Sequence, residues 1–486
     1  MLPKEIQILI AQIPPETQPL VKAIVAFYEH QVSDLKARVK ELEDQKAKNS
    51  SNSSKPPSTD PPKKKPKSTR TSTTRKPGGQ KGHKGTTLQL VDNPDDTIPH
   101  KVNECSCCTK DLSNQEALLI ARRQVHDIPL PKVKIIEHQS EVKPCSCGHI
   151  NTAFPAGVTH YVQYGPVLKS MATYLQDYQM LPYKRTKELF KDFFSISISQ
   201  GTLYNIGKTA YKKLESFKDR LKELLTYCLV VGFDETGFRV LATRLWLHSY
   251  STEKHAYFEV HAKRGREAMD EIGILPDFKG IAVHDFWKSY YTYCCEHALC
   301  NAHLLRDLIF IKERFEQPWA EELIQLLLKM KAAKEKAMEK DKPAFSQSTI
   351  KRYQDQYETI VQKGLEENPF KPPEKKSRGR YAKPPPRNLL ERLDKHQGDV
   401  LRFFLDFKVP FDNNFSERDL RMMKVKQKIS GGFRSLKGAK YFARIRSYIL
   451  TARKQNVNPL EALTNLFMDN TVGEWLTRDL ELFYAE

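Results

Sequence analysis

Residues 229–240 read LVVGFDETGFRV, and this stretch decides what kind of fold the chain adopts. The apolar, β-branched run Leu229–Val231 is of the kind that forms a buried strand, and two adjacent acids, Asp234 and Glu235, follow it. A buried carboxylate is costly unless it is paired or bound to a metal ion. The stretch therefore predicts a core strand that carries an acidic site.

Side-chain direction separates the two acids. Successive side chains of a strand point to opposite faces, so Asp234 shares a face with Val230 and Gly232 while Glu235 points the other way. We expect Asp234 to lie at the edge of the core, where a metal ion and further acids can meet it. We expect Glu235 to lie near the surface.

The residues that follow continue the strand pattern. Residues 243–251 (TRLWLHSYS) and 255–264 (HAYFEVHAKR) alternate as two more strands, and residues 265–276 (GREAMDEIGILP) show a helical pattern. Residues 280–291 (GIAVHDFWKSYY) then repeat the first stretch, because their apolar strand residues end on an acid, Asp285. Two strands of one sheet that each end on a carboxylate predict a shared site.

A third acid is predicted on a helix. In residues 411–429 (FDNNFSERDLRMMKVKQKI), Glu417, Arg421 and Lys424 stand at i, i+4 and i+7, so one helical face carries an acid followed by two cations. Asn414, three residues before Glu417, also predicts a capping box at the helix start. The two interpretations are compatible, because a capped first turn fixes the position of the Glu417 side chain.

Together, Asp234, Asp285 and Glu417 suit metal-dependent phosphodiester chemistry. That chemistry needs an attacking and a leaving oxygen held in line with their charges neutralised, and two Mg²⁺ ions about 3.5–4 Å apart do both. Hard ions such as Mg²⁺ or Mn²⁺ take their protein ligands from carboxylates. We expect two ions per active site, one strand carboxylate bridging them, and Arg421 and Lys424 facing the substrate phosphate.

The charge balance indicates a polyanionic partner. The 486 residues include 79 Lys or Arg and 59 Asp or Glu, a formal net charge of +20. Each phosphate that a basic protein neutralises releases a condensed counterion, so nucleic acid is favoured over a merely soluble basic protein. The length predicts three or more folded units. Without a run of about 18 apolar residues or a signal peptide, we expect a cytoplasmic protein with no membrane contact.

The N-terminal residues predict an oligomerisation helix followed by a linker. Apolar residues repeat at alternating intervals, which is the heptad seam of a coiled coil that joins two or more copies; a solitary amphipathic helix is the alternative. Residues 47–90, rich in Ser, Pro, Lys and Gly, are expected to be disordered when free and to lie along DNA phosphates. The seam consists of Val21, Val25, Tyr28, Val32, Leu35, Val39 and Leu42.

Two tight cysteine clusters, in residues 104–112 (ECSCCTKDL) and 143–151 (KPCSCGHIN), flank a β-like segment. In a reducing compartment such clusters favour a structural, tetrahedral Zn²⁺ site over disulfides. Free cysteines in a small β domain are the alternative. The expected ligands are Cys105, Cys108, Cys145 and Cys147, with Cys107 and His149 as substitutes.

Residues 159–222 are expected to be helical and to bind DNA. A helix, a short turn and a Ser199-capped helix within them resemble a helix-turn-helix, although many helical pairs share this pattern without touching DNA. The more polar side of the second helix carries the candidate DNA contacts Thr202, Asn205, Lys208 and Lys212.

An ordered set of motifs resembles the insertion-sequence-sixty-six family of bacterial DDE transposases. The resemblance implies an RNase H-like catalytic core with Asp234, Asp285 and Glu417 as its metal-binding triad. It also implies a helical insertion between the second acid and the glutamate. The motifs are residues 48–60 (KNSSNSSKPPSTD), 76–85 (KPGGQKGHKG), the cysteine module, 232–240 (GFDETGFRV), 284–291 (HDFWKSYY), 299–308 (LCNAHLLRDL) and 411–435 (FDNNFSERDLRMMKVKQKISGGFRS).

Patterns and resemblance together predict a multidomain α/β protein. Its expected parts are a coiled-coil helix (1–46), a disordered basic linker (47–90), a zinc-binding module (91–158), a helical DNA-binding region (159–222), the first part of the RNase H-like core (223–313), a helical insertion (314–399), the second part of the core with the Glu417 helix (400–435) and a C-terminal helical region (436–486).

Residues 294–308 (CCEHALCNAHLLRDL) allow two interpretations. Cys295, His297, Cys300 and His303 could be drawn as another zinc site. We favour a core strand followed by a helix, because strand alternation points His297 away from Cys300. His303 and Arg306 match a motif of the resembled family near its active site, so the resemblance implies that they contact DNA or phosphate and are not ligands.

The expected function is that of an insertion-sequence transposase. Such an enzyme cuts at the element's ends, exposes 3′-hydroxyls and joins them to double-stranded target DNA by direct attack, without a covalent protein intermediate. The resemblance implies a bacterial, nucleoid-associated homo-oligomer that works with or without accessory proteins encoded by the element. The alternatives are a catalytically silent DNA-binding regulator and a nuclease of the same fold that cuts without joining.

Overall fold

The computed structural model describes an α/β protein whose main sheet has five strands. Strands β3, β4 and β5 are antiparallel and β3, β6 and β7 are parallel, in the order β5-β4-β3-β6-β7. The strands are β3 (Val230–Val240), β4 (Thr243–Ser251), β5 (Ala256–His261), β6 (Ile281–His284) and β7 (Glu296–Leu299). The described residues are 12, 14–53, 88–128, 131–370, 383–470, 473 and 475–476.

Strand β3 runs on well past Asp234, so the expectation that it would end on this acid is wrong. Its two edges differ, because β4 pairs with β3 from Gly232 onward whereas the parallel pairing with β6 ends at Gly232 and Val283. The hairpin with β4 therefore extends β3, while the edge that faces β6 opens close to the acid. Strand β6 ends as predicted, at His284, one residue before Asp285.

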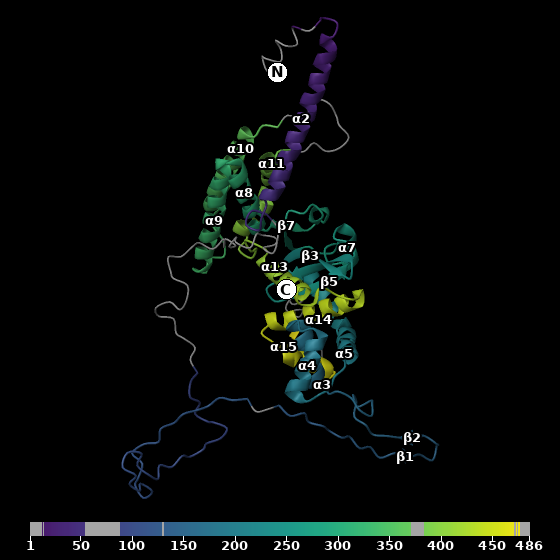
Figure 1. Cartoon of the computed structure of the whole chain (residues 1–486), viewed down its shortest axis with the longest axis vertical. Coiled ribbons are helices and arrows are strands. Elements are labelled where there is room, and N and C mark those ends of the chain that lie inside the picture. The colour runs from purple at the N-terminus through teal and green to yellow at the C-terminus, as the bar shows by residue number, and fades with distance from the viewer. Residues whose placement is uncertain are drawn as a thin grey trace.

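One hydrophobic core lies between the sheet and a set of helices, most of which come before or after the strands in the sequence (Figure 1). Val231 and Phe233 of β3 contribute to this core, and so do Tyr250 of β4 and Tyr257 of β5. The alternation of β3 thus directs its odd-numbered side chains inward on this face. The helices are α3 (Pro166–Thr173), the π-helix η2 (Tyr174–Tyr178), α4 (Tyr183–Phe194), α5 (Gln200–Lys213), α6 (Glu215–Tyr227), α7 (Arg266–Ile272), α14 (Leu436–Lys454) and α15 (Pro459–Phe467).

A second core is built largely by helices that lie between the second and third acids in the sequence. Val283 of β6 and Leu299 of β7 join it from the sheet, and Trp319 and Tyr357 are fully buried at its centre. The expected helical segment after residue 313 is therefore present, apart from residues 371–382, which lie outside the described part. The helices are α8 (Asn301–Phe315), α9 (Pro318–Met338), α10 (Gln347–Glu367), α11 (Pro385–Lys395) and α12 (Gln397–Leu405).

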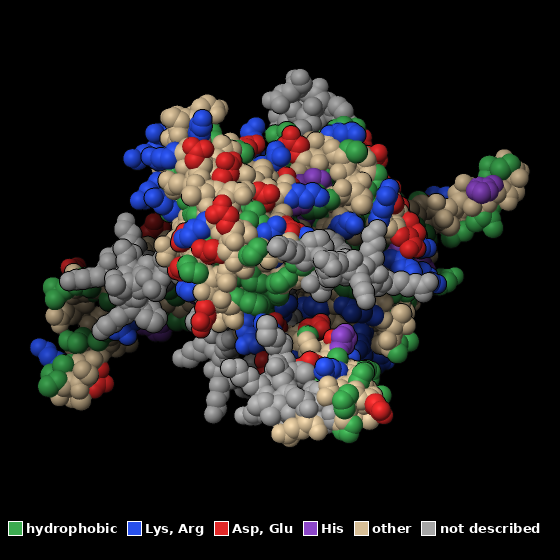
Figure 2. Space-filling model, turned by 90° about the horizontal axis from the view of Figure 1, so that it is seen from above, with side chains coloured by type: hydrophobic (Ala, Val, Ile, Leu, Met, Phe, Trp, Pro, Cys, Tyr) green, Lys and Arg blue, Asp and Glu red, His purple; other side chains and the backbone are tan. Residues whose placement is uncertain are grey.

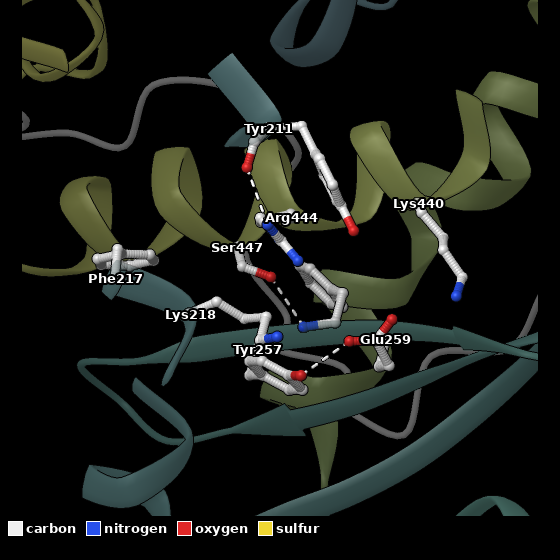
Figure 3. A pocket seen from close by; sticks show the side chains of 9 residues that line it. Tyr211, Phe217, Lys218, Tyr257, Glu259, Lys440, Arg444 and Ser447 are labelled. Atoms are coloured by element: carbon white, nitrogen blue, oxygen red, sulfur yellow. Dashed lines mark hydrogen bonds between the residues drawn. The ribbon is translucent and has the colours of Figure 1, made fainter. Parts of the chain in front are cut away.

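Hydroxyl groups of α14 cover the free edge of strand β5. Ser447 Oγ accepts a hydrogen bond from Phe258 N at 2.8 Å (Figure 3). Thr451 Oγ1 accepts one from Ala256 N at 3.1 Å. An uncovered edge strand would present unpaired backbone groups to other chains. Nearby, the guanidinium of Arg444 stacks over the ring of Tyr211 of α5 (Figure 3). It also forms an ion pair with Glu215 of α6. These contacts anchor α14 to the sheet and to helices α5 and α6.

Helix α2 (Gln18–Ala47) projects from the rest of the protein in Figure 1. Its apolar residues remain exposed along the predicted seam, from Tyr28 at 63% to Leu42 at 58% relative exposure. The end of the helix is held by Arg314 of α8, whose Nε donates to Asp44 Oδ1 at 2.6 Å. The helix is present as predicted, while most of the basic linker, residues 54–87, lies outside the described part.

The two cysteine clusters form separate turns. Cys105 N–H bonds to Lys110 O at 2.9 Å, and Cys145 N–H bonds to His149 O at 2.8 Å beside the short pair β1 (Lys143–Pro144) and β2 (Ile150–Asn151). Among the described residues, no three cysteine sulfurs approach one another closely enough to share an ion. Each cluster therefore forms a turn of its own, and a Zn²⁺ site across the two clusters stays a prediction.

The described helices include none long and apolar enough to cross a membrane. Lys and Arg side chains are spread over the face shown in Figure 2 and are interleaved with Asp and Glu. The positive charge on this face is therefore distributed and not gathered into one patch.

Candidate functional site

Parallel pairing places Asp234 and Asp285 at neighbouring positions. The pairing of β3 with β6 ends two residues before each acid, so the two carboxylates follow it at equivalent points. Each accepts a backbone hydrogen bond: Glu235 N donates to Asp234 Oδ1 at 2.8 Å, and Trp287 N donates to Asp285 Oδ1 at 2.9 Å. The two strand acids thus occupy one region of the sheet and are held by local backbone contacts.

Helix α13 (Asn414–Ser430) brings Glu417 to the same region across β3. It approaches closely because Gly232 has no side chain; a Cβ there would collide with Asn413 Oδ1 and lie 2.6 Å from Ser416 Oγ. The Asn413 side chain donates to Phe233 O at 2.8 Å, which ties the helix start to the strand. The glycine two residues before Asp234 is therefore a packing requirement of the site.

The predicted capping box is wrong. Helix α13 begins at Asn414, and the residue at its N-cap is Asn413, whose side chain caps no helical N–H. Glu417 N bonds to Asn413 O at 3.1 Å, as an ordinary helical turn requires. The Asn413 amide is already used by the β3 backbone, so the start of the helix is fixed by tertiary contact and not by a side-chain cap.

A second acid of α13, Asp419, holds the helix in place. Its Oδ2 accepts a hydrogen bond from Ser251 Oγ of β4 at 2.9 Å and lies 2.7 Å from Lys454 Nζ of α14. On the same side, Leu420 and Met423 are buried against the sheet. The helix that carries Glu417 is thus anchored by both polar and apolar contacts.

Electrostatics separate Asp234 from an ordinary surface acid. Burial raises the pKa of Asp234 well above its usual value, and the charges of Glu235, Asp285 and Glu417 raise it further. Like charges that meet in a poorly solvated site favour either protonation or the binding of a cation. The arrangement is one that a divalent ion would stabilise.

Glu235 is buried, so the expectation that it lies near the surface is wrong. Glu235 does lie on the opposite face of β3 from Asp234, as predicted. That opposite face, however, is also covered by other parts of the protein. The Glu235 carboxylate accepts a hydrogen bond from Tyr290 Oη at 2.5 Å and forms an ion pair with Arg264. Burial raises the pKa of Glu235 to about 7, with Asp285 adding to the shift and Arg264 opposing it.

Arg264 is a site residue that the sequence patterns missed. Its Nη2 lies 3.9 Å from Asp285 Oδ2, and its guanidinium stacks 4.1 Å from the Trp287 ring centroid and 5.2 Å from that of Trp246. A guanidinium between aromatic rings is held in one orientation. The one available signal was its place as the last residue of the predicted strand 255–264; its pairing with Glu235 depends on the fold.

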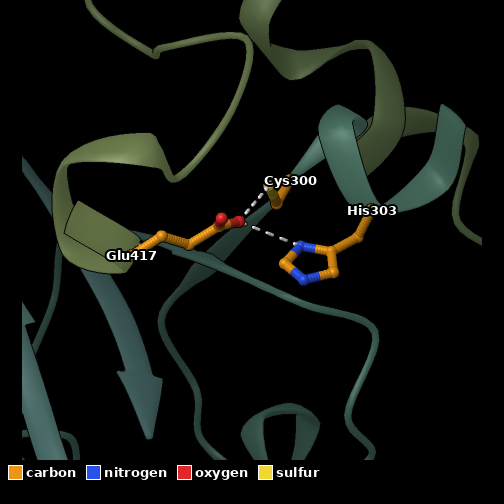
Figure 4. Close-up of side chains that lie close together, drawn as sticks. All are labelled: Cys300, His303 and Glu417. Carbon is orange, nitrogen blue, oxygen red and sulfur yellow. Dashed lines mark hydrogen bonds and ion pairs between the residues drawn. The ribbon is translucent and has the colours of Figure 1, made fainter. Parts of the chain in front are cut away.

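Glu417 is surrounded by residues from the end of β7 and the first turns of α8 (Figure 4). Its Oε1 lies 3.5 Å from His303 Nδ1 and 4.0 Å from Cys300 Sγ, and its Oε2 lies 3.8 Å from Arg306 Nη2. Burial and the charge of Glu417 raise the pKa of the Cys300 thiol to about 12. The Cys300 sulfur, a ring nitrogen of His303 and a carboxylate oxygen of Glu417 all lie within 4.8 Å of one another.

The strand-and-helix interpretation of residues 294–308 agrees with β7 and α8. His297 turns away from Cys300, as alternation predicts, and its Nδ1 lies 3.0 Å from His284 Nε2. The four-residue zinc site that could be drawn from the sequence is therefore not formed. Cys300 and His303 do come together, with Glu417 as the third member of the group.

The two cations predicted beside Glu417 differ in their surroundings. Arg421 is exposed one helical turn beyond the acid. Lys424 also lies on the surface, but its Nζ donates to Gly237 O of β3 at 2.6 Å. Arg421 is therefore available to a ligand, whereas Lys424 already helps to fix α13 on the strand.

The candidate DNA-binding helix α5 has the predicted polarity. Ser199 caps it, because its Oγ accepts from Thr202 N at 2.9 Å. Leu203, Ile206 and Ala210 are buried. On the outward side, Asn205, Lys208 and Lys212 are exposed and Thr202 is half-buried.

Comparison with known protein families assigns the part of the chain that contains the sheet and the three acids to one family. A family model described as Transposase IS66 family matches residues 161–441, and a Family of unknown function (DUF6444) matches residues 2–89. No curated protein matches the chain. The first match covers more than half of the 486 residues and contains the sheet, the three acids and the intervening helices. The protein is a member of the IS66 transposase family.

Proposed function

We propose that the protein is a metal-dependent DNA transposase that cuts at the ends of an insertion sequence and transfers the resulting 3′-hydroxyls into target DNA. One observation carries the proposal: Asp234 and Asp285 follow the paired ends of β3 and β6, and the charges of Asp285 and Glu417 both raise the pKa of Asp234. Membership of a transposase family supports a DNA-modifying enzyme. The cluster supplies the chemical reason.

We infer that the five-stranded sheet is an RNase H-like core. Its three antiparallel strands followed by two parallel ones bring acids from β3 and β6 together, and α13 adds the third. Between Asp285 and Glu417 the helical segment builds its own core and leaves the sheet intact. The interruption in sequence is thus compatible with one continuous site.

The donor set fits hard divalent ions. Asp234, Asp285 and Glu417 would hold two Mg²⁺ or Mn²⁺ ions, which supply an activated oxygen nucleophile and neutralise the charge of the leaving oxygen. Asp234 and Asp285 are pre-positioned by backbone N–H groups. Arg264 holds Glu235 and lies near Asp285, so the second acid of the Asp-Glu pair supports the site without entering it.

Residues around the acids would orient the DNA backbone. Arg306 and His303 lie beside Glu417 and would contact phosphate when the carboxylate is engaged elsewhere. Exposed Arg421 extends the same helical face, and Lys424 lies one turn further on. Cations that neutralise phosphates fix the register of DNA on a protein without reading its sequence.

Binding of the element's ends is proposed for the N-terminal half. The outward face of α5, with Thr202, Asn205, Lys208 and Lys212, suits a recognition helix. The cysteine turns support a structural Zn²⁺ module, because backbone N–H groups of the turns lower the pKa of Cys105 and of Cys145 and so favour thiolates. Zn²⁺ would then draw the two turns together through Cys105, Cys108, Cys145 and Cys147.

Assembly is proposed through α2. Its seam is exposed along the helix, and an isolated helix with such a seam is stabilised by burying it against a second copy. The protein would act as a homo-oligomer on the bacterial nucleoid, with element-encoded partners as candidates for accessory roles. Two DNA ends could then be held by one assembly.

The test is an end-cleavage assay with Mg²⁺ and a second target duplex. A transposase yields cleaved ends and joined products. A nuclease of the same fold yields cleavage without joining, and a silent DNA-binding regulator binds the ends but leaves them intact under the same conditions. Either of the last two results for the wild-type chain would overturn the proposal.

A further inference from the structure

Cys300, His303 and Glu417 form a donor set unlike that of the proposed Mg²⁺ site. One thiol sulfur, one imidazole nitrogen and one carboxylate oxygen lie within 4.8 Å of one another, the one such group of three among the described residues (Figure 4). Tetrahedral Zn²⁺ with bonds of about 2.0–2.3 Å places its ligand atoms roughly 3.3–3.5 Å apart. The observed separations of 3.5 and 4.0 Å from Glu417 Oε1 need only a small contraction.

Two contacts make the group ready for an ion. His303 Nδ1 is buried and has no hydrogen-bond partner, although Glu417 lies on one side of it. Cys300 Sγ accepts a hydrogen bond from Asn413 N at 3.2 Å, which fixes the position of the sulfur beside Glu417. A buried nitrogen without a partner is an unfavourable feature that a bound cation would remove.

The three donors are also rigidly placed. Cys300 is the N-cap of α8, and His303 follows in the first turn of the same helix. Glu417 is in the first turn of α13, and Asn301 at the start of α8 donates its N–H to Phe411 O, in the segment that leads into α13, at 3.1 Å. A site held by helix starts keeps its geometry without an ion, which lowers the cost of binding one.

Ligand chemistry assigns the ion. Thiolate and imidazole select Zn²⁺ and similar soft or borderline metals, whereas Mg²⁺ is held by oxygen ligands and water. The two kinds of ion would compete for Glu417, whose Oε1 faces Cys300 and His303. With Zn²⁺ bound, Glu417 is not free for Mg²⁺, and His303 is not free for phosphate.

We propose that Cys300, His303 and Glu417 form an inhibitory Zn²⁺ site that withdraws Glu417 from the Mg²⁺ centre. Cys300 loses its thiol proton to solvent when the ion binds, and water occupies the fourth position. The binding site stands on geometry alone, whereas its inhibitory effect rests on the proposed function.

Direct binding is tested with Co²⁺, which reports thiolate ligands through a near-ultraviolet charge-transfer absorption. The full-length chain, freed of metal, is titrated as wild type, Cys300→Ser and the matched control Cys294→Ser, an exposed cysteine. The N-terminal cysteines contribute equally to all three. We expect Cys300→Ser to bind one Co²⁺ fewer and the control to match the wild type. Equal stoichiometry and spectra in a folded Cys300→Ser chain would overturn the site.

His303→Gln replaces the imidazole by a polar amide and is a second variant in case Cys300→Ser does not fold. It is expected to weaken Co²⁺ binding at least tenfold while circular dichroism stays unchanged. Unaltered affinity in this variant would remove His303 from the site.

Inhibition is measured separately, as the Zn²⁺ concentration that halves Mg²⁺-supported cleavage, with each variant scaled to its own activity without Zn²⁺. Cys300→Ser should raise this concentration at least tenfold over wild type and Cys294→Ser. An unchanged value with Co²⁺ binding lost would overturn the inhibitory role. No cleavage by wild type in Mg²⁺ alone would instead overturn the proposed function and leave the binding result standing.

Discussion

Arg264 Nη2 lies 2.5 Å from Glu235 Oε1 and joins two side chains that the sequence does not place together. The pairing explains how β3 carries two consecutive acids into the protein. Glu235 is neutralised by Arg264 and by a hydrogen bond from Tyr290, whereas the surroundings of Asp234 include further acids. Adjacent carboxylates therefore have different surroundings: Glu235 is paired within the fold, and Asp234 is the acid that we propose for chemistry.

Asp234→Ala should abolish Mg²⁺-dependent cleavage and leave binding of element ends nearly intact. The acid belongs to the proposed metal-binding cluster, while the proposed end-binding surface lies on α5. Cleavage and gel-shift assays on the same DNA separate the two effects. Retained cleavage would remove Asp234 from the active site.

Glu235→Ala should act mainly on stability. Removing one partner of a buried ion pair typically costs 3–5 kcal/mol, but the Arg264 side chain is 37% exposed, so we expect a loss nearer about 2 kcal/mol. Chemical denaturation in EDTA measures it. A loss below about 0.5 kcal/mol would mean that the pair contributes little to the fold.

Glu235→Gln should change how stability depends on pH. Burial raises the pKa of Glu235 from an ordinary 4.5 to about 7, so its folded form binds a proton that the unfolded chain has released. Its contribution is fully present below pH 4.5 and is lost as pH rises through 7. Relative to wild type, the variant should gain roughly 3 kcal/mol of unfolding free energy between these limits. If the free energy of unfolding, measured in EDTA, changed with pH by the same amount in both proteins, this prediction would be contradicted.

Gly232→Ala should lower both stability and cleavage. The new Cβ would collide with Asn413 Oδ1 and push α13, with Glu417, away from β3. Gly207→Ala is a matched control, because nothing lies within 4 Å of a Cβ at that position. We expect a lower Tm and at least a tenfold loss of cleavage for Gly232→Ala alone. Similar behaviour of the two variants would show that the close approach is unimportant.

Arg421→Ala should weaken DNA binding without a large effect on stability. Arg421 is exposed beside Glu417, so its loss should reduce the slope of log affinity against log salt by about one. Arg352→Ala, an exposed arginine on α10, serves as the control. Fluorescence anisotropy over a range of salt concentrations compares them. If both variants keep the wild-type slope, Arg421 does not contact phosphate.

The seam of α2 should control the oligomeric state. A charged residue at Leu35 would disrupt apolar packing between copies, whereas Ala37→Asp places the same charge off the seam. Sedimentation should show dissociation for Leu35→Asp only. A wild-type chain that is already monomeric would rule out this mode of assembly.

The strands were predictable because their signal is local. Alternation and apolar runs placed β4, β5, β6 and β7 close to their observed positions, and the same alternation put Asp234 and Glu235 on opposite faces. The polarity of α5 and the helical nature of residues 314–399 followed in the same way from spacing along the chain. Such patterns depend on neighbours in sequence, so the sequence alone determines them.

Burial and partnership depended on the fold. The sequence could not show that the second face of β3 is covered, that Arg264 reaches Glu235, or that Asn413 is engaged by β3 and leaves no capping box. It also could not bring Cys300 to Glu417, which is 117 residues away in the chain. Electrostatic and packing energies act through space, so only the tertiary structure decides which acids meet cations and which meet one another.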